Sequence, residues 1–370
     1  MARSAALQTP ALSPSTDLKI GVPKVQPPAR AGADRASRPN ANDSPRAVVV
    51  REKLRESGTL VSRVSTDIMR TMAGGLIYCV DGGGTKSRAR LVDAAGTSLA
   101  ESEGGPCNPS TGFDRAVATF NALWRQCAAA AGLDAEELGG IVLSIGAAGF
   151  YVPAARSRFL AAIPRFAKTV ASSDCYAALI GAGSGKPCGL INVGTGVAGH
   201  RLWPSGVSVQ RDAWGWLGGD RGSGAWLGRK ALRHTLSVID GIRPPDGLSE
   251  RVLASAGGRV RLTEMLAGMT PDGLAALAPF VLAAADEGVP RAMEIRRRGI
   301  EHLTDLVRVL DIGDGDTLYA VGGLADVFAP CVGKRLSHAF ALPEADAMHG
   351  CYLLAAGRAP AERSPARIMA

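Results

Sequence analysis

Two glycine-rich turns in this sequence carry residue types that bind phosphate groups. Asp81-Gly-Gly-Gly-Thr-Lys86 follows the apolar run 76–80, and Gly194-Thr-Gly196 follows the apolar run 188–193. Glycines let phosphate oxygens approach backbone N–H groups closely, and a threonine hydroxyl adds a donor. Asp81 could hold Mg²⁺ through water, since Mg²⁺ keeps much of its hydration in proteins. The first turn lacks P-loop spacing, and either turn alone also fits an ordinary hairpin.

Gly322-Gly-Leu-Ala325 and Asp174 are further candidates for such a site. The glycines follow a predicted strand and open a helix, where an adenosine could pack against backbone, although glycine is routine at such turns. Asp174 follows a strand at the start of a helix, a position that favours a carboxylate. It could accept a proton as a general base or serve only as an N-cap, and one residue can do both.

The segment from Trp214 to Ser223 combines two tryptophans, four glycines and Asp220 directly before a predicted helix. Carboxylates accept hydrogen bonds from sugar hydroxyls, and an aromatic ring can lie against a sugar face, so this loop is a candidate sugar site. The alternative is a Gly-rich loop with tryptophans in the core. Asn108 offers both a donor and an acceptor, and it fits a turn asparagine equally well.

The elements that must position these residues alternate between strands and helices, which predicts an α/β fold. Strands at 76–80, 88–93 and 97–103 form a β-meander. A strand, a Gly/Thr turn and a returning strand recur at 188–203, which predicts a duplicated lobe with a cleft between the copies. Further strands are expected at 140–145, 168–171 and 317–321. Helices are expected at 113–131, 153–166, 175–182, 220–238, 271–287, 289–310 and 346–356.

Composition limits the kind of protein that this sequence can specify. Of the net charge of +8, about +6 lies in residues 1–70, so the remainder gives little reason to expect nucleic acid as a partner. The chain lacks 18 consecutive apolar residues and a signal-peptide pattern, so no membrane partner is expected. Seven scattered cysteines without a C-x-x-C pair predict reduced thiols in a cytoplasmic protein.

Residues 1–73 are predicted to be a disordered leader, rich in Pro, Ala, Arg and Ser and poor in aromatic residues. The favoured explanation is a start codon assigned too early, with Met69 or Met72 as the true first residue. A regulatory tail and a weak organelle-targeting peptide are the alternatives.

In this order the motifs resemble the BadF/BadG/BcrA/BcrD-type ATPase family of the actin-like superfamily, especially its N-acetylglucosamine kinase branch. The resemblance runs from about residue 76 to 356. It implies a two-lobed actin/hexokinase-like (ribonuclease H-like) duplicated α/β fold with an interdomain cleft. The expected parts are an N-terminal lobe at 74–187, a C-terminal lobe at 188–356 and a tail at 357–370. The final helix of the C-terminal lobe could dock on the N-terminal lobe.

The resemblance implies an ATP-dependent kinase that phosphorylates a hydroxyl of an amino sugar, expected to be the 6-OH of N-acetylglucosamine. Asp174 then corresponds to the catalytic base, and Mg²⁺ lies near Asp81 through water. The implied sugar contacts are Asn108, Thr195, Gly196, Trp214, Gly215 and Asp220. The implied ATP contacts are Asp81, Gly82, Gly83, Gly84, Thr85, Lys86, Gly194, Thr195, Gly196, Gly322, Gly323 and Ala325. The implied partners are therefore ATP and a small sugar, and a homodimer is common among such kinases.

Three residues depart from the family pattern. Arg221 replaces the usual Glu after Asp220, Val197 replaces a Ser, and Ser173 stands where Asn is common. The charge reversal at Arg221 leaves N-acetylglucosamine, glucosamine and glucose open as substrates. Two other functions stay open: an ATPase activator of a dehydratase, which uses a cysteine-bridged cluster, and a non-catalytic nucleotide-binding module. A zinc-containing glucokinase type is disfavoured, because its C-x-C-G-x-x-G-C pattern is absent.

Overall fold

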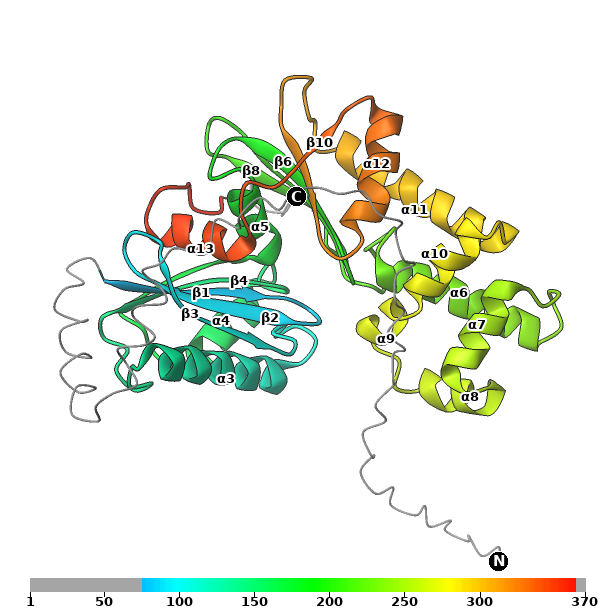
Figure 1. Ribbon diagram of the computed structural model, residues 1–370, viewed down its shortest axis with the longest axis horizontal. Helices are drawn as coiled ribbons and strands as arrows, with labels where there is room; N and C mark the ends of the chain where they lie inside the picture. The colour runs from blue at the N-terminus through cyan, green and yellow to red at the C-terminus, as the bar shows by residue number, and fades with distance from the viewer. Residues whose placement is uncertain (1–74, 364–370) are drawn as a thin grey trace, which may run out of the picture. The chain divides into compact units, whose positions relative to one another are not determined.

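The computed structural model describes residues 75–363, which lie in one compact unit and form two five-stranded sheets (Figure 1). The predicted leader at 1–73 and residues 364–370 of the predicted tail lie outside the described residues. The first sheet has the strand order β3-β2-β1-β4-β5. Its strands are β1 (Leu76–Gly82), β2 (Ser87–Val92), β3 (Ser98–Gly104), β4 (Ile141–Ala147) and β5 (Lys168–Ser173).

The second sheet repeats this arrangement strand for strand, in the order β10-β9-β6-β7-β8. Its strands are β6 (Cys188–Val193), β7 (Val197–Leu202), β8 (Ser208–Asp212), β9 (Leu318–Val321) and β10 (Phe340–Ala341). In each sheet the first three strands pair antiparallel, and the two later strands join parallel to the first. The predicted duplication is therefore confirmed, and equivalent turns follow β1 and β6.

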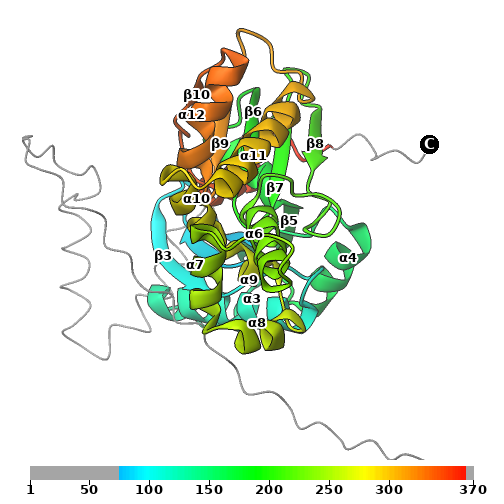
Figure 2. The same ribbon diagram turned by 90° about the vertical axis from the view of Figure 1, so that its right-hand side faces the viewer.

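Helices surround both sheets, and the second lobe carries a larger set of them between β8 and β9. The first lobe has α3 (Phe113–Ala131), α4 (Pro153–Ala162) and α5 (Asp174–Ala182). Then come α6 (Gly224–Ile239), α7 (Gly247–Ala256), α8 (Arg259–Leu266), α9 (Pro271–Ala275), α10 (Ala278–Asp286), α11 (Pro290–Arg308), α12 (Ala325–Leu336) and α13 (Ala347–Ala355). Figure 2 views the molecule from the side on which α6 to α11 lie.

Three clusters of buried side chains form the core. One lies between the first sheet and α3 and α4, and another between the second sheet and helices α6, α11 and α12. The third joins both sheets, because α5 and α13 lie between them (Figure 1). A Cβ added at Gly350 of α13 would lie 1.9 Å from the carbonyl oxygen of Ala177 on α5. The final helix thus packs directly on α5, at a distance that glycine permits.

The structure corrects several elements expected from the sequence. The expected helix 271–287 is two helices, α9 and α10, because Pro279 in the first turn of α10 cannot continue the preceding helix. The expected helix 153–166 ends at Ala162, because Pro164 favours the extended backbone that Ile163 adopts. Helices α7 and α8 and strands β8 and β10 were not expected.

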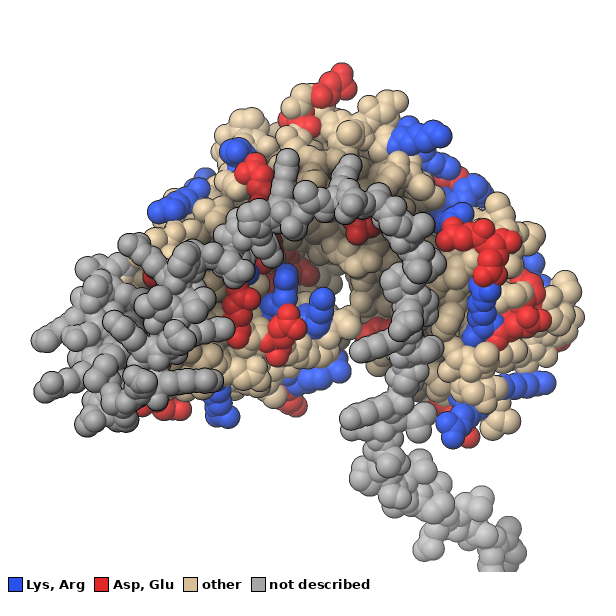
Figure 3. Space-filling model, viewed as in Figure 1, with Lys and Arg blue, Asp and Glu red and all other residues tan. Residues whose placement is uncertain are grey.

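The surface carries both signs of charge. On the face shown in Figure 3, Lys and Arg side chains are interspersed with Asp and Glu, in keeping with the near-neutral balance after residue 70. Within residues 75–363, no single helix is long and apolar enough to cross a membrane. The segments 271–286 and 290–308 reach that length and composition only as a pair, with a bend of 113° between them.

Candidate functional site

The two Gly/Thr turns meet, although 110 residues separate their threonines. The hydroxyl oxygens of Thr85 and Thr195 lie 2.8 Å apart, within hydrogen-bond distance. Each turn closes an antiparallel hairpin, β1–β2 in the first lobe and β6–β7 in the second. The duplication therefore places two equivalent candidate phosphate turns face to face.

The first turn has a fixed base and an exposed tip. The carbonyl oxygens of Gly82 and Gly83 accept hydrogen bonds from the backbone N–H groups of Ala148 and Cys107, at 2.8 and 2.9 Å. A Cβ at Gly83 would lie 2.4 Å from the Lys86 carbonyl oxygen, so a side chain there would open the turn. Gly84, Thr85 and Lys86 are exposed, and their backbone is accessible to a ligand.

Asp81 stands below this turn and is paired with a cation. Arg88 on β2 donates to its Oδ2 at 3.1 Å. Burial raises the pKa of Asp81, and the hydrogen bond and charge of Arg88 oppose that rise. The negative charge of Asp81 also raises the pKa of Asp174. A divalent cation near Asp81 would offset this negative charge.

The described residues hold no group of three or more His, Cys, Asp or Glu side chains with metal-ligand placement. A water-bridged Mg²⁺ that is bound mainly by nucleotide phosphates needs only one or two carboxylates from the protein. Asp81 fits that mode, because Arg88 engages only one of its two oxygens.

Gly322 and Gly323 lie beside the second turn. The Leu324 N–H donates to the Val193 carbonyl oxygen at 2.9 Å, which joins the start of α12 to the end of β6. Gly322 has a φ of 98°, and a Cβ there would lie 2.5 Å from the same carbonyl oxygen. Both the positive φ and the close approach to the carbonyl oxygen require glycine at this position. Ala325 is buried as the first residue of α12.

Asp220 lies behind the second turn. A Cβ at Gly196 would be 3.0 Å from Asp220 Oδ2, and the Val197 N–H donates to Asp220 Oδ1 at 3.3 Å. Burial raises the pKa of Asp220 to about 6, with a further contribution from Asp212. Its backbone N–H donates to Asp212 at 2.9 Å. The predicted sugar carboxylate and the predicted second phosphate turn are therefore adjacent.

The tryptophan loop is anchored by an arginine that sequence reasoning missed. Arg229 on α6 donates to the carbonyl oxygens of Trp216 and Leu217, at 2.6 and 3.3 Å. Trp216 packs against the core of the second lobe. Trp214 is 65% exposed, so its ring is presented at the surface rather than in the core. Gly215 between them has a φ of 85°.

Asp174 is the first residue of α5, at the end of β5. Ser173 caps the helix, its hydroxyl accepting from the Tyr176 N–H at 3.2 Å. Burial, followed by the charges of Asp81 and Glu362, raises the pKa of Asp174 to about 7. The Ser173 hydroxyl makes the N-cap hydrogen bond, so the helix does not need the Asp174 carboxylate as its N-cap.

Asn108 lies in the loop after β3, next to Cys107, whose N–H bonds the first turn. Its Oδ1 accepts from the Ser110 N–H at 2.9 Å, as in an Asx turn. A Cβ at Gly149 would lie 2.5 Å from this oxygen. The Asn108 oxygen therefore makes a turn contact, as one of the two interpretations of this residue expected.

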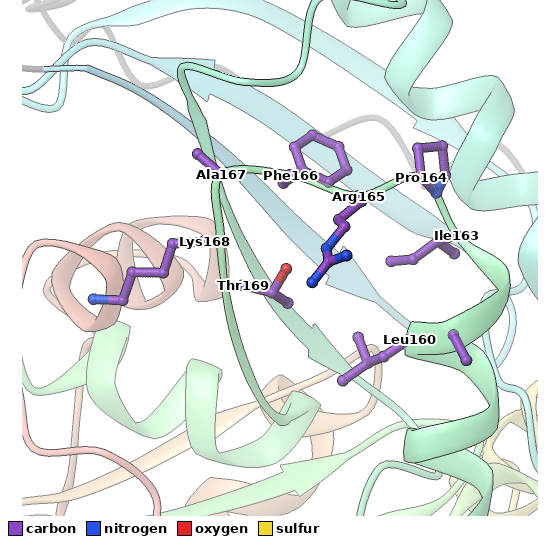
Figure 4. A pocket seen from close by; sticks show the side chains of 9 residues that line it. Leu160, Ile163, Pro164, Arg165, Phe166, Ala167, Lys168 and Thr169 are labelled. Carbon is purple, nitrogen blue, oxygen red and sulfur yellow. The ribbon is translucent and has the colours of Figure 1, made fainter.

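One pocket lies away from these residues. It has a volume of about 460 Å³ and is lined by residues 160, 161 and 163–169 (Figure 4). It adjoins the start of β5, whereas Asp174 follows the opposite end of that strand. On the face in Figure 3, the surface is also hollowed between the first lobe and helices α7 to α9. The convergence of the two turns, and not the pocket of Figure 4, identifies the candidate site.

Known proteins resemble this chain in sequence and in fold. A family model described as the BadF/BadG/BcrA/BcrD ATPase family matches residues 79–325. Glucosamine kinase GspK of Vibrio cholerae is 24% identical over 283 residues, 75% of this chain and 94% of that protein. A crystal structure of a proposed N-acetylglucosamine kinase from Chromobacterium violaceum is 30% identical, with a TM-score of 0.71 over 76% of this chain and 99% of that one.

A second crystal structure, from Porphyromonas gingivalis, is 20% identical, with a TM-score of 0.57 over 76% of this chain and 98% of that one, and shares the fold. The expected two-lobed actin/hexokinase-like fold is thus confirmed. Because the family model covers more than half of the chain, including both turns, Asp174 and Asp220, this chain belongs to the BadF/BadG/BcrA/BcrD ATPase family.

Proposed function

We propose that this chain is an ATP-dependent kinase of an amino sugar, with N-acetylglucosamine as the substrate and its 6-hydroxyl as the acceptor. Two relatives support the sugar class, since one is named a glucosamine kinase and the other a proposed N-acetylglucosamine kinase. The higher identity of the second favours N-acetylglucosamine. Glucosamine and glucose are the alternatives.

The observation that carries the proposal is the contact between Thr85 and Thr195. Phosphoryl transfer needs donors around the phosphates, a metal and a base more than it needs covalent chemistry. Two glycine turns that face each other can hold a nucleotide's phosphates through backbone N–H groups. Gly322 and Gly323 beside the second turn leave backbone open to the adenosine.

In the proposed reaction Asp174 accepts the proton of the attacking hydroxyl. A base with a pKa of about 7 is poised to gain and lose a proton near neutral pH. Asp220 and Asn108 hold sugar hydroxyls from the two lobes, and the exposed Trp214 lies against the sugar face. Mg²⁺, held through water by Asp81, would neutralise charge on the phosphates when bound.

In this proposal Arg221 does not form an ion pair with Asp220, the carboxylate expected to bind the sugar. The side-chain charges that act on Asp220 are those of Asp212 and Arg229. Arg221 acts instead on His302 of α11: burial, followed by the charge of Arg221, lowers the pKa of His302. The departure from the family pattern therefore faces α11, and Asp220 Oδ2 can accept a hydrogen bond from a sugar hydroxyl while Oδ1 accepts from the Val197 N–H.

The experiment is an ADP-release assay with Mg-ATP against a panel of N-acetylglucosamine, glucosamine, glucose and N-acetylmannosamine. We expect one amino sugar to stimulate release, and Asp174→Asn to lower that turnover by about a hundredfold or more while ATP still binds. Asp114→Asn is the matched control, since Asp114 also lies in the first turn of a helix but is exposed on α3. Near-normal turnover in Asp174→Asn would remove this residue from the role of base.

One of the two other functions left open by the sequence, the dehydratase activator, gives a different result in the same assay. An ATPase activator of a dehydratase would bind ATP without stimulation by any sugar, and the purified protein would carry an iron–sulfur chromophore. Of the seven cysteines, only Cys331 is exposed, and it lies on α12. Six buried thiols do not favour a cluster shared at a surface.

A further inference from the structure

The described end of the chain lies against the start of α5. After α13, Glu362 reaches Ser173, the residue before Asp174. Its Oε2 accepts from the Ser173 N–H at 2.9 Å, and its Oε1 accepts from the Ser173 hydroxyl at 2.7 Å. That hydroxyl also accepts from the Tyr176 N–H at 3.2 Å to cap the helix. One carboxylate therefore accepts from both hydrogen-bond donors of the N-cap residue.

Neighbouring residues of this segment make two more attachments. The Tyr176 hydroxyl on α5 donates to the Pro360 carbonyl oxygen at 2.8 Å. The Ser208 N–H and hydroxyl on β8 both donate to the Arg363 carbonyl oxygen at 3.4 Å. Figure 2 shows the described end of the chain beside β8, which is an edge strand of the second sheet. Residues 360–363 thus bond to α5 on one side and to the second lobe on the other.

Glu362 lies close enough to Asp174 for the two carboxylates to repel each other, which a purely structural contact would not require. The charged groups around Asp174 are Asp81 on β1, with its partner Arg88 on β2, and Glu362, while the buried thiol of Cys175 follows on α5 itself. A second carboxylate beside a buried one makes its ionisation harder. Hydrogen bonds from Ser173 to the Glu362 carboxylate are charge-assisted and offset this repulsion. The negative charge of Glu362 still disfavours ionisation of Asp174.

We propose that Glu362 is a positioning residue for Asp174, and that residues 360–363 form a strap that ties the proposed catalytic end of α5 to the second lobe. This inference rests on the proposed function, in which Asp174 accepts the proton. By holding Ser173, Glu362 fixes where α5 begins and so where the Asp174 carboxylate lies. Through Ser208, the same strap joins the start of α5, where the proposed base lies, to β8 of the second lobe.

The test compares Glu362→Gln and Glu362→Ala in the full chain. Glutamine can keep two hydrogen bonds, because its oxygen accepts from the Ser173 N–H and its amide donates to the Ser173 hydroxyl. It removes only the charge. Alanine removes charge and contacts alike. Glu344→Gln is the matched control, an exposed glutamate whose partner is Lys186 at 3.2 Å. A chain ending at Arg358 is compared with one ending at Arg363, which keeps the strap.

For Glu362→Ala and for the chain ending at Arg358, we expect kcat to fall about ten- to hundredfold, with KM for ATP within about twofold of the wild type. In Glu362→Gln, we expect kcat to be largely retained and the acid limb of the pH profile to move to lower pH. The direction follows because removing the negative charge beside Asp174 lowers its pKa. The chain ending at Arg363 and Glu344→Gln should match the wild type.

Unchanged kcat in Glu362→Ala, or an acid limb that does not move in Glu362→Gln, would overturn the proposal. A second readout does not depend on kinase activity. A ¹³C-carboxylate NMR titration follows Asp174, identified by loss of its signal in Asp174→Asn, in the wild type and in Glu362→Gln. A lower pKa in the variant supports the strap even if no sugar is phosphorylated, whereas an equal pKa contradicts it. Failure of the proposed function is thus separable from failure of this inference.

Discussion

Replacing Asp174 by asparagine is predicted to stabilise the folded chain at alkaline pH. The folded pKa of Asp174 is about 7, whereas an unfolded aspartate titrates near about 3.9. The folded state therefore binds the proton more tightly. The stability that this group contributes is fully present below about pH 4 and is lost as pH rises through about 7. The difference between the two pKa values corresponds to a change in the free energy of unfolding of at most about 4 kcal/mol.

The assay is urea denaturation of the wild type and Asp174→Asn at pH 5 and pH 8. At pH 8 the variant's free energy of unfolding should exceed that of the wild type by about 1–4 kcal/mol, and the gap should narrow markedly at pH 5. Asp114→Asn, exposed in the first turn of α3, should show no such pH dependence. A wild type that is equally or more stable at pH 8, or a gap that is the same at both pH values, would refute the reasoning.

Three other perturbations have expected outcomes. Gly350→Ala should destabilise the fold by about 1–3 kcal/mol in urea, because its Cβ would lie 1.9 Å from the Ala177 oxygen. Gly299→Ala on α11, where the nearest atom is 3.7 Å away, should be neutral or stabilising by contrast. In a pH profile, kcat/KM at pH 6 should be about one-tenth of its alkaline plateau, because protonated Asp174 accepts no proton; a flat profile would argue against this base. Asp220→Asn should raise KM for the sugar about ten- to hundredfold with KM for ATP unchanged, and equal effects on both would contradict a sugar role.

Local patterns predicted the parts of the fold that depend on short stretches of sequence. The strand before Asp81 and the strand before Gly194 are apolar runs with turn residues after them, so the duplication could be found. Helix α7 was missed although a capping-box signal precedes it, with Asp246 and Ser249 bonding each other's backbone N–H groups. Strand β10 has only two residues, too few to show the alternation of apolar and polar residues that predicts a strand.

For the site residues too, local sequence patterns indicated some positions and missed others. Asp81 and Asp174 could be proposed from the sequence because each directly follows a predicted strand. Arg88 was missed, although the antiparallel register that places it opposite Asp81 follows from the hairpin itself. Glu362 stands 189 residues from Ser173, and only packing of α13 on α5 brings it there. Contacts of that kind depend on tertiary structure, and no local pattern signals them.

The most direct test of the central claim is ³¹P NMR of the wild-type protein with Mg-ATP and N-acetylglucosamine. The proposal predicts a new phosphomonoester signal that couples to the C6 protons of the sugar and grows in proportion to ADP. Consumption of ATP with only inorganic phosphate as product, or no consumption with any amino sugar of the panel, would contradict it.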